Sequence, residues 1–130
     1  MNNYPIDHVA IAVRSIQEST KIFETITGCA CSVIEELPIQ DVNVAFFGSL
    51  ELIEPRSTHG VIGRFIERNG PGLHHIAYRV PDILTAIEEF EEQGFETIDN
   101  RPRPGARGHQ IVFLNPKTTG NVLIELVQQP

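Results

Sequence analysis

Hydrophobic and polar positions follow one pattern twice along the chain. Residues 7–13 read DHVAIAV and residues 74–80 read HHIAYRV, and each run passes from polar residues that include a histidine into apolar residues that end in valine. Runs of this kind predict half-buried β-strands. The two histidines, His8 and His75, lie 67 positions apart (75 − 8). The chain therefore contains a repeat, and its first element is a strand that carries a histidine.

A helical period follows each of these strands at the same offset. Residues 16–23 and 83–90 place apolar side chains at three- and four-residue spacing, which predicts two amphipathic helices. We expect each helix to stop at a glycine, Gly28 or Gly94, because glycine readily takes the left-handed conformation that closes a helix. The first two elements of the repeat are thus a strand and a helix.

Short strand-like runs follow each glycine. They cover residues 31–35, 42–47 and 50–53 in the first half, and residues 95–98, 110–114 and 122–127 in the second. Each half is therefore predicted to form one βαβββ module. Between the halves, residues 62–68 have the pattern of a short amphipathic helix, and the breaker Gly-Pro-Gly follows at 70–72.

These elements predict an α+β fold of two tandem βαβββ modules. The boundaries are about 4–56 for module one, about 57–71 for a linker helix and about 72–130 for module two. Neither module closes a hydrophobic layer alone, so we expect them to form one curved mixed sheet with helices on its outer face. The concave face of that sheet is where a ligand is expected.

Composition narrows the function. The 130 residues fit one domain, and 17 Asp and Glu against 10 Lys and Arg give a net charge of −7. A surface of this sign repels a phosphate backbone, which argues against nucleic-acid binding. No apolar stretch is long enough for a membrane span, and the first residues lack the layout of a secretory signal. We therefore expect a cytoplasmic protein without a membrane role.

Two carboxylates occupy matching places near the ends of the modules. Glu51 lies in LELI and Glu125 in IELV, so each interrupts an otherwise apolar strand. A single such glutamate would be expected to face solvent. Two of them, repeated together with His8 and His75, instead predict a shared centre, because buried carboxylates need a compensating cation. Two imidazoles and two carboxylates suit cobalt, nickel, zinc or manganese.

The remaining candidates have simpler interpretations. His74 should lie on the strand face opposite His75 and pack or face solvent, and His59 and His109 are expected at the surface. The three arginines of residues 101–108, together with Lys117, either form a solvated loop or bind an anionic ligand. The chain has neither a nucleotide phosphate loop nor the Gly-x-Ser-x-Gly motif of serine hydrolases.

The residues that carry these patterns also resemble a known family. The sequence is similar to the vicinal oxygen chelate superfamily, which includes glyoxalase I, and within it to the methylmalonyl-CoA epimerases. The resemblance covers nearly the whole chain. It lies in IDHVAIAV at 6–13, LELIEP at 50–55, GLHHIAYRV at 72–80, PR at 102–103, GA at 105–106, FLNPK at 113–117 and GNVLIEL at 120–126.

The resemblance implies metal ligands at His8, Glu51, His75 and Glu125, a coenzyme A thioester substrate and a homodimer. The metal is expected to be cobalt, with manganese, nickel or zinc as alternatives.

For the substrate we expect contacts from Gln40, Arg103 and Lys117. Some bacterial relatives carry a further catalytic glutamate on the strand that here contains Val44, and the histidine of their His-Pro-Lys motif is Asn115 here.

The implied activity is a metal-dependent epimerase that interconverts the 2R and 2S forms of methylmalonyl-CoA, or of a closely related malonyl thioester. It would proceed through a metal-stabilised enediolate, with Glu51 and Glu125 exchanging protons on opposite faces of C2. Two alternatives stay open at this point. One is a lactoylglutathione lyase of the glyoxalase I type, and the other is a protein of the same superfamily that sequesters a small ligand.

Overall fold

The computed structural model describes residues 3–130 and divides the chain into two compact units. One unit contains the chain up to His8 together with His75–Pro130, and the other contains Val9–His74. The division passes through the two strands that open the repeats, β1 (Ile6–Ala12) and β5 (Gly72–Arg79). Each of these strands therefore contributes residues to both units.

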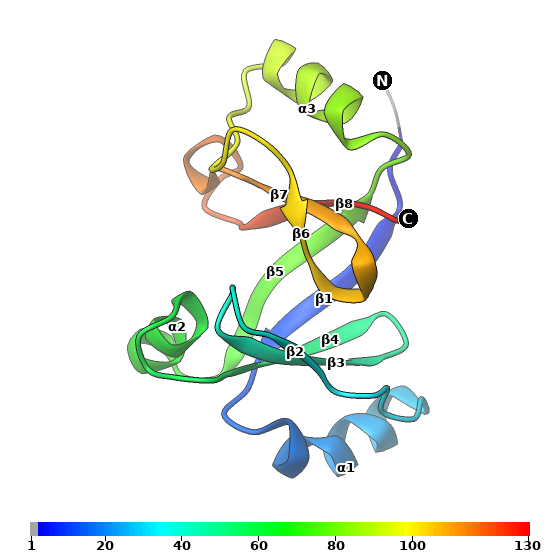
Figure 1. Cartoon of the computed structure of the whole chain (residues 1–130), viewed down its shortest axis with the longest axis vertical. Helices are drawn as coiled ribbons and strands as arrows, with labels where there is room; N and C mark the ends of the chain where they lie inside the picture. Colours follow the sequence, from blue (N-terminus) through cyan, green and yellow to red (C-terminus); the bar gives the residue numbers. More distant parts are fainter. Residues whose placement is uncertain (1–2) are drawn as a thin grey trace. The chain divides into compact units, whose positions relative to one another are not determined.

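The unit of residues 9–74 contains the later part of β1 and five complete elements. These are α1 (Ile16–Thr27), β2 (Glu35–Leu37), β3 (Val42–Phe47), β4 (Leu50–Pro55) and α2 (Val61–Asn69). β2, β3 and β4 are antiparallel in chain order, and β4 runs parallel to β1. The helix α1 lies along β3 and β4 (Figure 1). The core on this side is apolar and contains Val13, Ile16, Ala45, Phe47 and Leu52.

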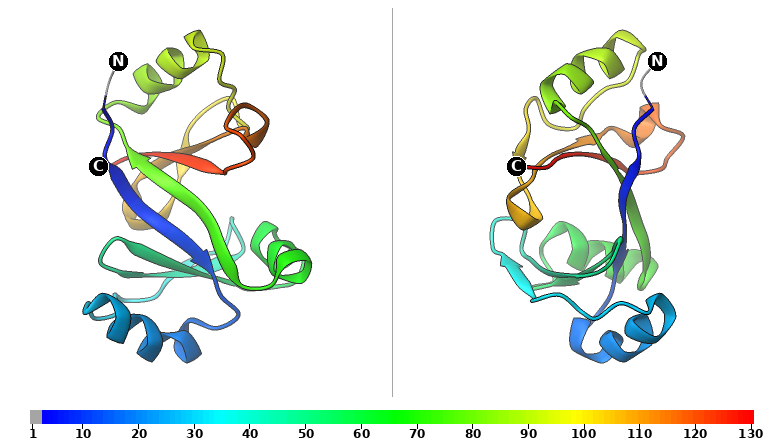
Figure 2. Two further views of the ribbon diagram at one scale, coloured as in Figure 1. Left: turned by 180° about the vertical axis from the view of Figure 1, so that it is seen from behind. Right: turned by 90° about the vertical axis from the view of Figure 1, so that its right-hand side faces the viewer.

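The other unit repeats this plan. It contains the later part of β5, α3 (Ile83–Glu92), β6 (Arg103–Pro104), the 3-10 turns Ala106–Gly108 and Pro116–Thr118, β7 (Gln110–Leu114) and β8 (Ile124–Gln128). β6, β7 and β8 are antiparallel in chain order, and β8 runs parallel to β5. The helix α3 packs against β7 and β8, and Figure 2 shows it on one side of the strands of this unit. Its core contains Val80, Ile83, Ala86, Ile87, Val112, Leu114 and Leu126.

The strands of this unit have two different faces, one that packs against α3 and one that carries a second, smaller cluster of side chains. Side chains on a strand point to opposite faces in turn. The face away from the α3 core carries a small cluster of Ala77, Ile111 and Val127, with Phe113 packed against it. His75 and Glu125 precede Ala77 and Val127 by two positions and therefore share this face. The alternation of side chains along β5 and β8 thus places the predicted ligands His75 and Glu125 on the face opposite α3.

Matched hydrogen bonds attach each helix to the last strand of its own half. The backbone N–H of Ile16, the first residue of α1, donates to Glu54 Oε1 at 2.9 Å. The backbone N–H of Ile83, the first residue of α3, donates to Gln128 Oε1 at 2.8 Å. Glu54 and Gln128 each follow a predicted ligand, Glu51 or Glu125, by three residues. The repeat seen in the sequence is therefore also a repeat of contacts.

The predicted helix ends are nearly those observed. Gly28 closes α1 in the left-handed conformation, with φ of +70°, and donates its N–H to the carbonyl of Glu24 at 2.9 Å. In the second half α3 ends at Glu92, and Gln93 precedes Gly94, whose φ is +94°. The prediction that Gly94 directly closes the helix was therefore wrong by one residue.

Three predicted strand segments differ from the structure. Residues 31–34 are irregular, and β2 covers 35–37. The backbone N–H of Cys31 donates to the Glu24 carboxylate, and Ser32 bonds to Phe46 of β3 through its backbone N–H and through its hydroxyl, which accepts from Phe46 N–H. Residues 95–98 make a single bridge, Thr97 with Leu114, instead of a strand. The loop at 101–108 contains the short strand β6, which the sequence did not predict. The strand predicted at 122–127 begins at Ile124.

Within residues 3–130, none of the helices combines the length and the apolar content that crossing a membrane requires.

Gly63 in α2 provides a test of packing. A Cβ at this position would lie 2.3 Å from the carbonyl oxygen of Ser57 and 2.9 Å from Thr58 Cα, and both are backbone atoms. We expect Gly63→Ala to lower the free energy of unfolding by about 1–3 kcal/mol, because this clash outweighs the gain in helix propensity. Urea titration measures this, with Gly72→Ala as control because a Cβ there meets nothing within 4 Å. Equal stability of the two variants would contradict the packing assigned to α2.

Candidate metal centre

Two histidine nitrogens converge on one carboxylate oxygen within the unit that contains α3. Nε2 of His8 lies 3.3 Å from Glu125 Oε1, and Nε2 of His75 lies 3.7 Å from the same oxygen. The two imidazole rings meet edge to face, with centroids 5.6 Å apart. All three residues are about 95% buried. The structure therefore brings together three of the four predicted ligands, His8, His75 and Glu125.

The strand register explains the position of Glu125. In the parallel pair of β5 and β8, Glu125 lies opposite Ala77. Ala77 follows His75 by two residues, so both point to the same face of β5. His75 is held further by Phe113, whose ring meets the imidazole at 87° with centroids 5.2 Å apart. Three neighbouring strands, β5, β8 and β7, thus fix the second histidine and its carboxylate.

The electrostatics of Glu125 favour its ionised form. Burial on its own would raise the pKa of this carboxyl, but the contacts with His75 and His8 outweigh burial and lower its pKa to about 2. A buried carboxylate between two imidazoles offers one oxygen and two nitrogens to a common point. This donor set is one that zinc, cobalt and similar divalent ions prefer, so the residues fit such an ion.

Asp7 is a buried carboxylate beside His8 that the sequence analysis did not identify as a site residue. It is 7% exposed, and its Oδ2 lies 2.7 Å from Nδ1 of His8. Its Oδ1 accepts hydrogen bonds from Arg79 Nε at 3.2 Å and from Gln129 Nε2 at 3.3 Å. Burial opposes ionisation of Asp7, but His8, Arg79 and Arg107 together lower its pKa. The repeat could have given a hint, because His74 occupies the equivalent position.

His109 was predicted at the surface, and this was wrong. It is only 9% exposed, and its backbone carbonyl and N–H bond to Gly105 and Ala106 within the loop. Burial, followed by the charge of Arg107, lowers the pKa of His109, so the neutral imidazole is favoured. Its position directly after Gly108 suggested an exposed loop, and no periodicity in that segment indicated burial.

The other two histidine predictions are confirmed. His74 packs edge to face against Phe65 of α2, with ring centroids 5.0 Å apart. His59 is exposed.

Glu51 and Gln40 belong to the unit of residues 9–74. Glu51 lies on β4, is 5% exposed and pairs with Ala10 of β1. Gln40 lies in the turn that joins β2 to β3. The pairing of Glu51 with Ala10 has the same register as that of Glu125 with Ala77. The role of Glu51 as a ligand and that of Gln40 in substrate binding stay predictions.

The two predicted basic substrate contacts lie in the unit that contains α3. Arg103 is on β6, and its Nε lies 3.7 Å from Oδ2 of Asp99. Lys117 is exposed on the 3-10 turn that follows β7. Of the loop arginines, Arg107 reaches Asp7, with Nη2 3.6 Å from Oδ2. The basic loop is therefore solvated in part, and one of its arginines pairs with the carboxylate beside His8.

Comparison with known proteins identifies the family of this chain. Residues 7–113 match the Glyoxalase/Bleomycin resistance protein/Dioxygenase superfamily. The chain is 40% identical to the protein YqjC of Bacillus subtilis over 127 residues. The matched region covers 95% of this chain and 91% of YqjC. It is 33% identical over 129 residues to the ethylmalonyl-CoA/methylmalonyl-CoA epimerase of Cereibacter sphaeroides, covering 95% and 96% of the two chains.

A solved structure of methylmalonyl-CoA epimerase from Mycobacterium tuberculosis superimposes with a TM-score of 0.91 at 28% identity, covering 97% of this chain and 88% of that one. These relatives confirm the predicted fold and support an isomerase of the epimerase type. The chain belongs to the glyoxalase, bleomycin resistance and dioxygenase superfamily, the vicinal oxygen chelate proteins.

Proposed function

We propose that this chain epimerises methylmalonyl-CoA, or a closely related substituted malonyl-CoA such as the ethyl derivative, with the help of one divalent metal ion. The observation that carries the proposal is the convergence of His8 and His75 on Glu125, in a chain whose relatives are named epimerases of these thioesters. Cobalt is the proposed ion, with manganese, nickel and zinc as alternatives. A homodimer and a cytoplasmic location stay predictions.

We infer that Glu51 is the fourth metal ligand. The support is internal to the strands. Glu51 pairs with Ala10, two residues beyond His8, as Glu125 pairs with Ala77, two residues beyond His75. Residues two apart on a strand share a face, so each module offers one histidine and one glutamate in the same relation. When bound, the ion would polarise the carboxylate and thioester oxygens and stabilise the negative charge that develops after loss of the C2 proton.

The chain itself must move that proton. A carboxylate can accept the C2 proton on one face, and a carboxyl group can return a proton on the other face, which inverts the centre. Glu125 and Glu51 are the proposed pair, with Glu125 as the principal base, and one or both would detach from the metal to exchange the proton. The strand position at which some relatives carry a further glutamate is Val44, which is 2% exposed and lies beside Ile53. Proton transfer in this chain is therefore assigned to the two glutamates of β4 and β8.

Isotope exchange tests the proposed reaction directly. In heavy water the protein, loaded with Co²⁺, should incorporate deuterium at C2 of methylmalonyl-CoA, and removal of the metal with a chelator should abolish the exchange. Parallel assays with ethylmalonyl-CoA and with methylglyoxal plus glutathione distinguish the epimerase from a glyoxalase. Turnover of the glutathione adduct without exchange on either malonyl thioester would overturn the proposal. A protein that purifies without metal and exchanges nothing would indicate ligand sequestration.

The same assay identifies the base. Glu125→Gln should reduce exchange by about 100-fold or more, because the amide cannot accept the proton. Glu91→Gln, which removes one exposed carboxylate from α3, is the matched control and should retain wild-type exchange. A Glu125→Gln protein that still binds metal and keeps full exchange would show that another group moves the proton.

Substrate binding by the basic residues has its own signature. Arg103→Ala and Lys117→Ala should each raise KM for the coenzyme A thioester by about five- to tenfold and change kcat little, because they would contact phosphates remote from C2. Gln40→Ala should also raise KM. Added salt should narrow the gap between wild type and the arginine and lysine variants. Lys21→Ala on α1 is the control, and equal KM values for all the proteins would remove these residues from the binding site.

A further inference from the structure

His8 is held from both sides by carboxylates. Nδ1 of its imidazole faces Asp7 Oδ2 at 2.7 Å, and Nε2 faces Glu125 Oε1 at 3.3 Å. An ionised carboxylate can only accept hydrogen bonds, so the short contact to Asp7 requires a proton on Nδ1. With Nδ1 protonated, the other nitrogen is the one that can offer a lone pair to a metal ion.

We propose that Asp7 is a positioning residue, which fixes the ring of His8 and keeps Nε2 directed at the centre by accepting the Nδ1–H bond. This inference rests on the proposed metal-dependent function, because it assigns the support of one ligand in that site. Asp7 touches no reacting atom and acts through His8. Support of this kind orients a ligand and increases its basicity.

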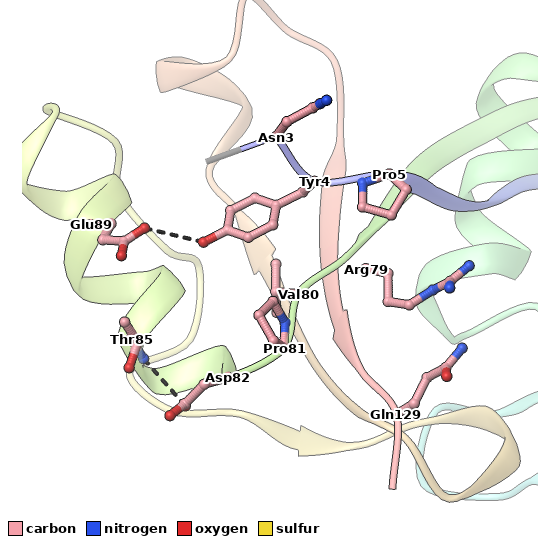
Figure 3. Close-up of a pocket in the computed structure, with 10 residues that line it drawn as sticks. All are labelled: Asn3, Tyr4, Pro5, Arg79, Val80, Pro81, Asp82, Thr85, Glu89 and Gln129. Atoms are coloured by element: carbon pink, nitrogen blue, oxygen red, sulfur yellow. Dashed lines mark hydrogen bonds between the residues drawn. The ribbon is translucent and has the colours of Figure 1, made fainter. Parts of the chain in front are cut away.

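Asp7 is itself held in place by groups at the surface of the unit. Arg79 and Gln129 both donate to its Oδ1, while Oδ2 is left to His8 and to Arg107 at 3.6 Å. Arg79 and Gln129 also line a pocket of about 480 Å³ beside α3 (Figure 3). In that view the two side chains extend away from the Tyr4–Glu89 hydrogen bond at the other end of the pocket. The cationic Arg79 therefore compensates the buried Asp7 from the solvent side.

The two modules differ at the position of Asp7. At the position equivalent to Asp7 the second module carries His74, which packs against Phe65, while His75 meets the ring of Phe113. A carboxylate at position 7 is thus not required by the strand that begins each module. Burying the Asp7 carboxylate is unfavourable unless its charge is compensated. Arg79 and Arg107 provide positive charge beside it, and Gln129 donates a hydrogen bond to it. The carboxylate at position 7 is therefore a feature of the first module, where its Oδ2 faces Nδ1 of His8.

Two variants separate positioning from simple support of the fold. Asp7→Ala removes the acceptor, whereas Asp7→Asn keeps an amide oxygen that can accept the Nδ1–H bond but lacks the charge. Glu91→Gln is the control for loss of one negative charge far along α3. Urea unfolding of the metal-free proteins establishes that each variant is folded, and Asp7→Asn carries the test if Asp7→Ala is not.

The first readout needs neither metal nor substrate. In ¹⁵N NMR spectra of the metal-free protein, with the His8 signals assigned by comparison with His8→Gln, Nδ1 should be protonated in the wild type and in Asp7→Asn. In Asp7→Ala the single proton of the neutral ring should move from Nδ1 to Nε2, because Nε2 still faces the carboxylate of Glu125. The second readout is titration with Co²⁺ alone. Asp7→Ala should bind it about 10- to 100-fold more weakly than wild type, and Asp7→Asn should lie between them.

The outcomes separate this inference from the proposed function. A bare Nδ1 in the wild type, or wild-type Co²⁺ affinity in a folded Asp7→Ala protein, would overturn the positioning role. If Asp7→Ala does not fold, wild-type affinity in Asp7→Asn would overturn the contribution of the charge. If the Nδ1 proton and the Co²⁺ affinity change as expected while the wild type exchanges no malonyl thioester, the positioning role is supported and the proposed substrate is wrong.

Discussion

The burial of Glu125 is the constraint on which the candidate site depends. A carboxylate that is 5% exposed is unfavourable unless its charge is compensated, and here two imidazole nitrogens lie within 4 Å of one of its oxygens. The same arrangement buries two histidines whose polar nitrogens also need partners. Each of the three groups therefore makes the burial of the others tolerable. A divalent ion at their common point would satisfy all of them at once, which is why the donor set fits a metal better than it fits an apolar core.

The fold provides this arrangement through strand register. Parallel pairing sets Glu125 opposite Ala77 and Glu51 opposite Ala10, and in each case the histidine is two residues back on the same strand face. The helix of each module lies on the other side, over side chains of the alternate positions. The apolar core and the polar centre thus occupy opposite faces of the same strands. A strand whose sequence is otherwise apolar can therefore carry one glutamate that points to the polar centre.

Much of this was predictable from the sequence, and the exceptions have physical causes. The repeat of strand, helix and strands follows from periodicity, and the pairing of His8 with His75 and Glu125 follows from the repeat. Periodicity did not find Asp7, because the residue next to a strand ligand is expected on the other face, whereas its carboxylate bonds the neighbouring ring. His109 was missed because loop burial leaves no period. Of the strand expected at 31–35, residues 31–34 are irregular, and the backbone N–H of Cys31 donates to the carboxylate of Glu24 instead of to a neighbouring strand.

The bonds from the first residue of each helix to the last strand of its module have a consequence for evolution and folding. Gln128, three residues after Glu125, accepts a hydrogen bond from the backbone N–H of Ile83. Glu54, three residues after Glu51, accepts one from the backbone N–H of Ile16. A slip of one residue in either strand would turn its glutamate to the helix side and also detach the start of that helix. The register of each strand is thus constrained on both of its faces, by the glutamate on one face and by the hydrogen bond to the helix on the other. The loop before β7 can therefore change in length and sequence between relatives without moving the glutamate of β8, since the helix anchors that strand independently.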